Sequence, residues 1–325
     1  MNTRDLAPGV SVTESIEIVK KLIVERKADF ILGGPVRSEA ALAAMDILSE
    51  HNKISILTTG VLTPKYHALI EEKYDNYKNC FRITGEAKWM VNEIITCLDY
   101  IKETYGFNKI QLILQDVSHS LAGGDIIGKL ASQRGWTVTG RAVYPTGAND
   151  FSRALRKAAE SSAQVLLIWM DMPESAILLK QWHDMKIPAL PFGAIIPTVA
   201  EPGFWDKVEG KGEYCLDSVV NAGNAPSDAT QWTMKFYKAY TQKWGVEPEG
   251  YGASSSFMAT YVLKDAIERA DSLDSNKVIA ALESTDIIGV YGRIRFGHKN
   301  HQVIPSFDPK EGAVGTIFQW QGEKG

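Results

Sequence analysis

Hydrophobic residues in this chain alternate between helical spacing and short apolar runs. In the segment 11–28, Val19 and Ile23 recur at helical spacing, after a capping box formed by Ser11 and Glu14. The apolar run "DFIL" that follows predicts a buried strand. The same pattern predicts further strands at 54–57, 109–114, 137–144, 164–170, 189–194, 289–296 and 315–321. It predicts further helices at 39–50, 89–106, 124–135, 150–161, 173–185, 229–245, 254–270 and 276–285.

This alternation predicts an α/β fold. Strands of about 4–7 residues that alternate with helices of about 10–18 residues are typical of parallel sheets covered by helices on both faces. At 325 residues the chain is too long for one ordinary core, so we expect two domains. The segment "NAGNAPSD" at 221–228 is the clearest candidate for a crossover between them.

Composition narrows the classes of partner. Hydrophobic residues make up 45% of the chain and charged residues 23%, which is ordinary for a globular protein. A net charge of −4 gives no general attraction to phosphate backbones or anionic lipid, so we expect no nucleic-acid partner. No stretch approaches ~18 consecutive apolar residues, so we expect no direct insertion into a membrane. The first ten residues, "MNTRDLAPGV", lack the pattern of a signal peptide.

Signatures of enzymes, metals and cofactors are missing from the sequence. No GxGxxG follows a predicted strand, and neither GxxxxGK[ST] nor GxSxG occurs. The neighbours Asp116, Ser118 and His119 do not predict a triad, because triad members converge from separate loops. We interpret "HKNH" at 298–301 as a solvated turn rather than a metal pair. The cysteines form no CxxC pair and predict buried free thiols: Cys80, Cys97 and Cys215. We therefore predict that the protein is not an enzyme and that it binds no cofactor and no metal.

Two short loops follow neighbouring predicted strands and carry candidate binding residues. In "GGPVRSE", Ser38 is either only the N-cap of the next helix or a donor to a ligand carboxylate beside the free N–H groups of that helix. Arg37 either adds positive charge or is solvated at the rim. In "TTGVLTP", Gly60 either lets a ligand approach the backbone or simply forms a turn. Ligands bind beyond the carboxyl ends of parallel strands, and both loops lie there.

Three segments resemble type I periplasmic binding proteins, and more narrowly the branched-chain amino-acid-binding solute receptors of ABC transporters. They are "ADFILGGPVRSEAALAAMDILSEHNKISILTTGVLTP", "KIQLILQDVSHSLAGGDIIGKLASQRGWTV" and "YPTGANDFSRALRKAAESSAQVLLI". The resemblance implies two doubly wound parallel-sheet lobes joined by three crossovers, with a ligand cleft between them. It places lobe one at 1–86 plus 225–305 and lobe two at 87–224 plus 306–325.

The resemblance also implies roles for individual residues. Ser38 matches the serine that binds the ligand carboxylate, and Gly60 matches a backbone contact. Leu62 stands where a hydroxyl residue is common, and Ile196 stands where amino-acid binders often have an acid for the ligand ammonium. These two departures argue for a carboxylate with an apolar body rather than a standard α-amino acid. The predicted ligand-binding residues are Arg37, Ser38, Thr59, Gly60, Val61, Leu62, His119, Ser120, Trp169, Asp171 and Ile196.

The function that the resemblance implies is capture of a small carboxylate, an amino acid or an aromatic or branched acid, by closure of the two lobes. A membrane permease of an ABC importer would read the closed shape, in the periplasm or outside the cell. The alternative is a ligand-sensing regulatory domain of the same fold. The family begins with a strand, a helix and a second strand, and "MNTRDLAPG" looks like the loop after that second strand. We therefore expect lobe one to be incomplete in the chain as printed, with an unpaired strand edge.

Overall fold

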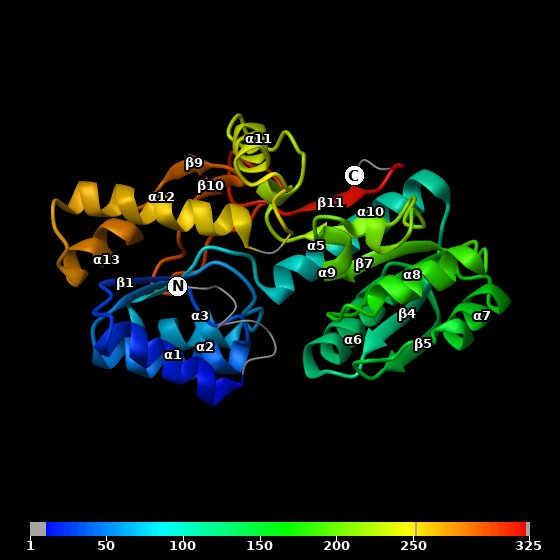
Figure 1. The fold of residues 1–325 in the computed structure, drawn as a ribbon, viewed down its shortest axis with the longest axis horizontal. Coiled ribbons are helices and arrows are strands. Elements are labelled where there is room, and N and C mark those ends of the chain that lie inside the picture. Colours follow the sequence, from blue (N-terminus) through cyan, green and yellow to red (C-terminus); the bar gives the residue numbers. More distant parts are fainter. Residues whose placement is uncertain (1–10, 251, 323–325) are drawn as a thin grey trace. The chain divides into compact units, whose positions relative to one another are not determined.

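The chain divides into two compact units, drawn in Figure 1 with colours that follow the sequence. This computed structural model describes residues 11–250 and 252–322; the segment 1–10, which we compared with a loop after a strand, lies outside the described residues. Unit 1 contains residues 11–87, 220–243 and 252–315, and unit 2 contains residues 88–219, 244–250 and 316–322. The main crossovers therefore lie near residues 88, 220 and 316.

Unit 1 is built on a three-stranded parallel sheet. Its strand order is β1 (Phe30–Gly33), β2 (Ile54–Leu57) and β3 (Cys80–Arg82). A separate antiparallel pair consists of β9 (Ile287–Gly289) and β10 (Gly292–Ile294). The helices of unit 1 are α1 (Val12–Val24), α2 (Ser38–Glu50), α3 (Lys65–Glu72), α4 (Tyr74–Tyr77), α11 (Thr233–Trp244), α12 (Ala253–Ala270) and α13 (Ser275–Glu283), with a 3-10 turn at Ala222–Asn224.

The sheet of unit 1 is covered on both faces, as Figure 1 shows for α12 and α13 on one side and for α1 and α2 on the other. Ile54 and Ile56 of β2 belong to the core cluster that contains residues of α12 and α13. Leu57 belongs to the opposite cluster, with residues of α1 and α2. Because successive strand residues point to opposite faces, a strand buried on both faces must be apolar throughout. This explains why three of the four residues of β2 are apolar, with the small buried Ser55 as the exception.

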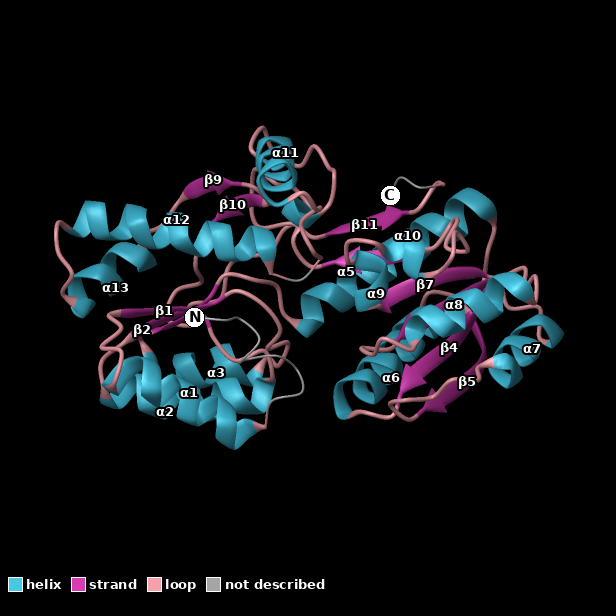
Figure 2. Cartoon of the chain, viewed as in Figure 1, coloured by secondary structure: helices cyan, strands magenta, loops and turns pink. Residues whose placement is uncertain are grey.

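Unit 2 contains a six-stranded sheet, whose strands Figure 2 colours magenta. The order is β11-β8-β7-β6-β4-β5; β11 is antiparallel to β8 and the other neighbours are parallel. The strands are β4 (Lys109–Gln115), β5 (Thr137–Tyr144), β6 (Val165–Trp169), β7 (Leu190–Ile195), β8 (Leu216–Val219) and β11 (Thr316–Gln319). The helices are α5 (Ala87–Tyr105), α6 (Ser118–Gln133), α7 (Ser152–Glu160), α8 (Ser175–Asp184), α9 (Pro197–Ala200) and α10 (Phe204–Lys207).

The predicted fold class is confirmed, since both units have parallel sheets with helices packed against them. The capping box is also confirmed: Ser11 Oγ accepts from the backbone N–H of Glu14 at 3.2 Å, and Ser11 N–H donates to the Glu14 carboxylate at 2.9 Å. Cys80 and Cys215 are buried free thiols, and Cys97 is a half-buried one. Within the described residues, no helix is both long and apolar enough to cross a membrane.

Three local predictions were wrong. The predicted single strand 289–296 belongs to a tight antiparallel pair that turns at Val290 and Tyr291, just before Gly292, whose φ is +109°. The strands β3 and β8 were missed because each is short and carries a buried ionisable residue, Arg82 or Asp217. The "HKNH" segment is not simply a solvated turn, because His301 is fully buried and stacks on Phe81 at 4.1 Å between ring centroids.

The boundary of the predicted lobes also needs correction. Residues 306–315 were assigned to lobe two, but they belong to unit 1. The backbone explains this: Ala313 N–H donates to Ile304 O at 2.9 Å, and Val314 N–H donates to Tyr291 O at 2.8 Å. The chain joins unit 2 again only at β11.

Candidate functional site

Two loops of unit 1 meet at the carboxyl ends of β1 and β2. Thr58 N–H donates to Gly33 O at 3.3 Å, and Val61 N–H donates to Val36 O at 2.9 Å. Because β1 and β2 are adjacent and parallel, the loops that follow them lie side by side. The structure thus joins the two loops that the sequence pattern had indicated separately.

Gly60 is required by the protein's own backbone. Its φ is +58°, and a Cβ added there would lie 2.2 Å from Val36 O. Val61 follows with a φ of +51°, an unusual conformation for a β-branched residue, and its side chain is buried. The loop after β2 therefore holds two consecutive residues in the left-handed region, tied to the loop after β1.

Ser38 is the first residue of α2 rather than its N-cap. The N-cap position is Arg37, which has extended backbone and makes no side-chain cap hydrogen bond. The Arg37 side chain is exposed, and its Nε lies 3.9 Å from the Glu39 carboxylate. The first backbone N–H groups of a helix have no partner within the helix, and Ser38 is half-buried beside them. This end of α2 carries the donor types that suit a carboxylate.

The start of α12 forms a third part of this edge. Ser255 Oγ donates to the carbonyl oxygen of Thr58, and Ser256 Oγ donates to Thr58 Oγ1 at 3.0 Å. Thr58 itself is buried. Three serines at the start of a predicted helix were the only sequence signal for this contact. The partners lie about two hundred positions apart in the chain, as the 198-residue separation of Ser256 from Thr58 shows.

Arg82 lies beneath the loop after β2. It is fully buried, and its Nη1 donates to the carbonyl oxygens of Val61 and Thr63, the latter at 3.0 Å. Its Nε donates to the Gln302 side-chain oxygen, and its Nη2 lies 2.8 Å from His67 Nδ1. Burial lowers the pKa of the Arg82 guanidinium to about 10, which leaves the group charged at neutral pH.

In unit 2, Ser120 connects the ends of β4 and β6. Its Oγ accepts from the backbone N–H of Gln115 at 3.0 Å and donates to Trp169 O at 2.6 Å. Ser120 is fully buried, whereas His119 is exposed at the start of α6. The hydroxyl of Ser120 therefore already satisfies backbone groups of its own unit.

Trp169 is the last residue of β6, and Asp171 lies two positions after it. The Trp169 ring is buried against α6, where a Cβ on Gly123 would lie 2.1 Å from it. Asp171 is half-buried. Burial raises the pKa of the Asp171 carboxyl; the charge of nearby His119 opposes this rise, and Glu201 adds to it. A half-buried carboxyl with a raised pKa is a plausible acceptor for a donor group of a ligand.

Ile196, after β7, covers a buried acid. Asp217 of β8 accepts from the backbone N–H groups of Ile196 and Ser218, and its Oδ1 has no hydrogen-bond partner among the described residues. Both Ile196 and Asp217 are 1% exposed. Burial raises the pKa of the Asp217 carboxyl well above its ordinary value. Gly193 makes room for it, because a Cβ there would lie 2.0 Å from Asp217 Oδ1.

A family model described as "Periplasmic binding protein" matches residues 8–309 of the chain. The chain belongs to the periplasmic binding protein family. A curated relative of this periplasmic binding protein is the Leu/Ile/Val-binding protein homolog 3 of Brucella melitensis biotype 1, 23% identical over 294 residues, which cover 90% of this chain and 73% of the relative.

Solved structures share the fold at low identity. A putative branched-chain amino acid ABC transporter protein from Silicibacter pomeroyi has a TM-score of 0.81 at 18% identity, covering 96% of this chain and 80% of that one. A solute-binding protein from R. palustris, solved in complex with benzoate, has a TM-score of 0.73 at 14% identity, covering 97% and 80%. A substrate-binding protein from Streptococcus pneumoniae, in complex with isoleucine, has a TM-score of 0.72 at 16% identity, covering 95% and 84%.

The structure places the predicted ligand residues of this periplasmic binding protein in two groups, one in each unit. Unit 1 holds six of them on the paired loops: Arg37, Ser38, Thr59, Gly60, Val61 and Leu62. Unit 2 holds the other five after β4, within and after β6, and after β7: His119, Ser120, Trp169, Asp171 and Ile196. Four of the eleven are buried: Val61, Ser120, Trp169 and Ile196. Contact of any of these residues with a ligand stays a prediction.

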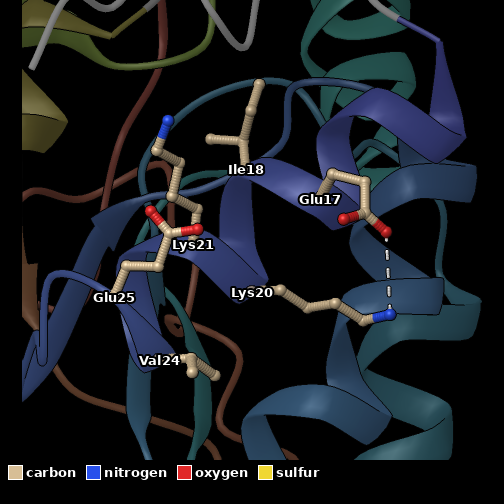
Figure 3. A pocket seen from close by; sticks show the side chains of 6 residues that line it. All are labelled: Glu17, Ile18, Lys20, Lys21, Val24 and Glu25. Atoms are coloured by element: carbon tan, nitrogen blue, oxygen red, sulfur yellow. Dashed lines mark ion pairs between the residues drawn. The ribbon is translucent and has the colours of Figure 1, made fainter.

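A surface hollow of this periplasmic binding protein lies elsewhere in unit 1. Figure 3 shows it on the outer side of α1, lined by Glu17, Ile18, Lys20, Lys21, Val24 and Glu25. Lys20 and Glu17 form an ion pair there, with 3.7 Å between nitrogen and oxygen. The predicted ligand residues are not among those that line it. Among the described residues, no group of three or more His, Cys, Asp or Glu side chains is arranged to hold a metal ion.

Proposed function

We propose that this protein is the solute-binding component of an ABC importer, exported to the periplasm or the cell exterior, and that it captures a small carboxylate by lobe closure. Membership of the periplasmic binding protein family supports this proposal. The observation that carries it is the joining of the loops after β1 and β2 at the first turn of α2. A helix N-terminus with a serine hydroxyl beside it favours an anionic group.

The names of the similar structures support a carboxylate as the common ligand group. Isoleucine and benzoate, bound in two of those structures, both combine a carboxylate with an apolar body. They differ in the ammonium group, which only isoleucine has. Ile196 offers no charge for an ammonium, and burial of an unpaired ammonium is costly. We therefore propose an aromatic or branched acid as ligand, with Asp171 as the acceptor if the ligand carries an amine.

The proposed partner is a membrane permease. The names of the similar structures from Silicibacter pomeroyi, R. palustris and Streptococcus pneumoniae all refer to a transporter, which favours transport over the alternative of a regulatory domain. The relatives and similar structures are not described as enzymes, and we propose that this chain performs no catalysis.

A thermal-shift screen tests the ligand class. The probes are leucine, isoleucine and valine, their desamino analogues 4-methylpentanoate, 3-methylpentanoate and 3-methylbutanoate, and benzoate. A ligand that binds only the folded state raises the melting temperature, by an amount that grows with its concentration over its Kd. We expect shifts with benzoate or the desamino acids. Tight binding of the amino acids without their desamino analogues would refute this ligand class and favour Asp171 as the ammonium site.

Replacement of Ser38 tests the carboxylate site. Ser38→Ala should weaken binding of the best probe by about 1–3 kcal/mol in calorimetry, because a charged acceptor loses a hydrogen bond. Ser49→Ala, near the other end of α2, is the matched control and should leave the affinity unchanged. Equal affinities of the wild type and Ser38→Ala would remove Ser38 from the proposed site.

A further inference from the structure

Arg82 is a buried cation, and none of the hydrogen bonds of its guanidinium in the described chain goes to a carboxylate. Its partners are two backbone carbonyls, the Gln302 amide oxygen and the His67 ring nitrogen. Burial of a charge is unfavourable unless hydrogen bonds replace its hydration. The charge of Glu86 raises the pKa of Arg82 against the larger effect of burial, but the hydrogen bonds of the guanidinium go to other groups. Two of them bind carbonyl oxygens of the loop after β2.

The carbonyls that Arg82 binds belong to Val61 and Thr63, on either side of Leu62. Gly60 and Val61 both have positive φ, a conformation that a β-branched residue adopts only when its surroundings impose it. One contact that imposes it is the bond from Val61 N–H to Val36 O. The guanidinium binds the carbonyl oxygen of the same residue, which belongs to the next peptide group.

We propose that Arg82 is a positioning residue that fixes the loop of residues 59–63 in the conformation the candidate site needs. This inference rests on the proposed function only in its final step, the effect on ligand affinity. The loop carries four of the predicted ligand residues, and Arg82 of β3 binds its backbone. A loop that is already ordered in the free protein binds a ligand without the entropy cost of becoming ordered on binding.

The geometry requires a guanidinium rather than a simple positive charge. Nε, Nη1 and Nη2 each contact a different group, and Nη1 serves two carbonyls. The Gln302 amide that accepts from Arg82 Nε is itself held in place, because its Nε2 donates to Thr84 O at 2.8 Å. The Arg82 guanidinium carbon also lies 5.7 Å from the centroid of the Tyr66 ring. A lysine has one nitrogen and cannot reproduce this planar set of donors.

The test combines Arg82→Lys with hydrogen exchange measured by mass spectrometry. Arg82→Lys keeps the charge but loses the fork, so the peptide that contains residues 58–64 should exchange at least about tenfold faster than in the wild type. Arg269→Lys is the matched control, because Arg269 lies on α12 in the same unit and pairs at the surface with Asp265. It should leave the loop unchanged. If Arg82→Lys does not fold, Gln302→Met offers a second test. It keeps the guanidinium of Arg82 but removes the side-chain oxygen that Nε binds, and it should also raise hydrogen exchange in the loop.

Two outcomes would overturn the inference. Loop exchange equal to that of the wild type in both variants would mean that Arg82 does not hold the loop. An equal rise over β1, β2 and the loop would mean that Arg82 only stabilises unit 1 as a whole. Local acceleration confined to residues 58–64 supports the inference.

The ligand step has its own measurement, with benzoate and isoleucine as calorimetric probes. Where the wild type binds a probe, Arg82→Lys should raise its Kd about tenfold or more under conditions in which both proteins are fully folded. An unchanged Kd together with a faster loop would refute the role in ligand binding. If neither probe binds the wild type while loop exchange still rises in the variant, the ligand class under the proposed function fails and the holding of the loop by Arg82 stands.

Discussion

Replacement of Gly60 by alanine is the most direct test of how the two loops of unit 1 are joined. Gly60 has a φ of +58°, and an added Cβ would lie 2.2 Å from Val36 O and 2.7 Å from Val36 Cγ1. Because the nearest atom is a backbone carbonyl, it cannot rotate away as a flexible side chain would. The loops must separate, and the hydrogen bond from Val61 N–H to Val36 O must lengthen or break.

The magnitude follows from these contacts. A left-handed conformation costs an alanine about 1–2 kcal/mol. Loss of one backbone hydrogen bond costs about 1 kcal/mol more. The reduced freedom of the unfolded chain offsets roughly 0.5 kcal/mol of this. We therefore expect Gly60→Ala to lower the free energy of unfolding of unit 1 by about 2 kcal/mol.

Urea unfolding followed by circular dichroism measures this change, with hydrogen exchange of residues 30–33 and 54–57 to assign it to unit 1. The control is Gly106→Ala, because Gly106 has a φ of +72° and no atom within 4 Å of an added Cβ. It isolates the backbone strain and should cost about 1 kcal/mol. If Gly60→Ala costs no more than Gly106→Ala, the contact with Val36 does not restrain the loop, and our account of Gly60 is wrong.

Two further predictions concern buried ionisable groups. Burial raises the pKa of Asp217 above its ordinary value of 3.8, so the stability that the protonated carboxyl contributes is lost as the pH rises. In urea unfolding, the free energy of unfolding of the wild type should therefore fall between about pH 5 and 8. Asp217→Asn should make this fall smaller. Burial lowers the pKa of His301 below 6.5, more than the Glu283 carboxylate raises it, so its contribution is lost as the pH falls. His301→Gln should make unit 1 less sensitive to acid between about pH 7 and 5 in the same assay, and an unchanged slope would contradict the assignment.

Much of the fold could be predicted because its strongest signals are local. The apolar runs of β1 and β6, and the largely apolar β2, stand out because strands covered on both faces bury nearly all of their side chains. The two strands that were missed, β3 and β8, do not follow this apolar pattern. Arg82 in β3 and Asp217 in β8 place an ionisable side chain in a strand, and each has a hydrogen-bond partner from another part of the fold.

The position of the candidate site could be predicted from the sequence, but the contacts that hold its loops could not. The loops after β1 and β2 follow from the general rule about the carboxyl ends of parallel strands. The contact between Gly60 and Val36 could not be read from the sequence, which left open whether the glycine serves a ligand or a turn. Ser255 and Gln302 lie far along the chain from the loops they support, so only the folded chain brings them together.

The interleaving of unit 1 along the chain has a consequence for biosynthesis. One face of its first sheet packs against Val262 of α12 and Leu282 of α13, which are translated about two hundred residues after Ile54. During synthesis, this apolar face stays open while unit 2 is already largely complete, since most of unit 2 is the continuous stretch 88–219. The first-made sheet is therefore the last to be closed, and it is the part of the nascent chain that most needs protection from aggregation.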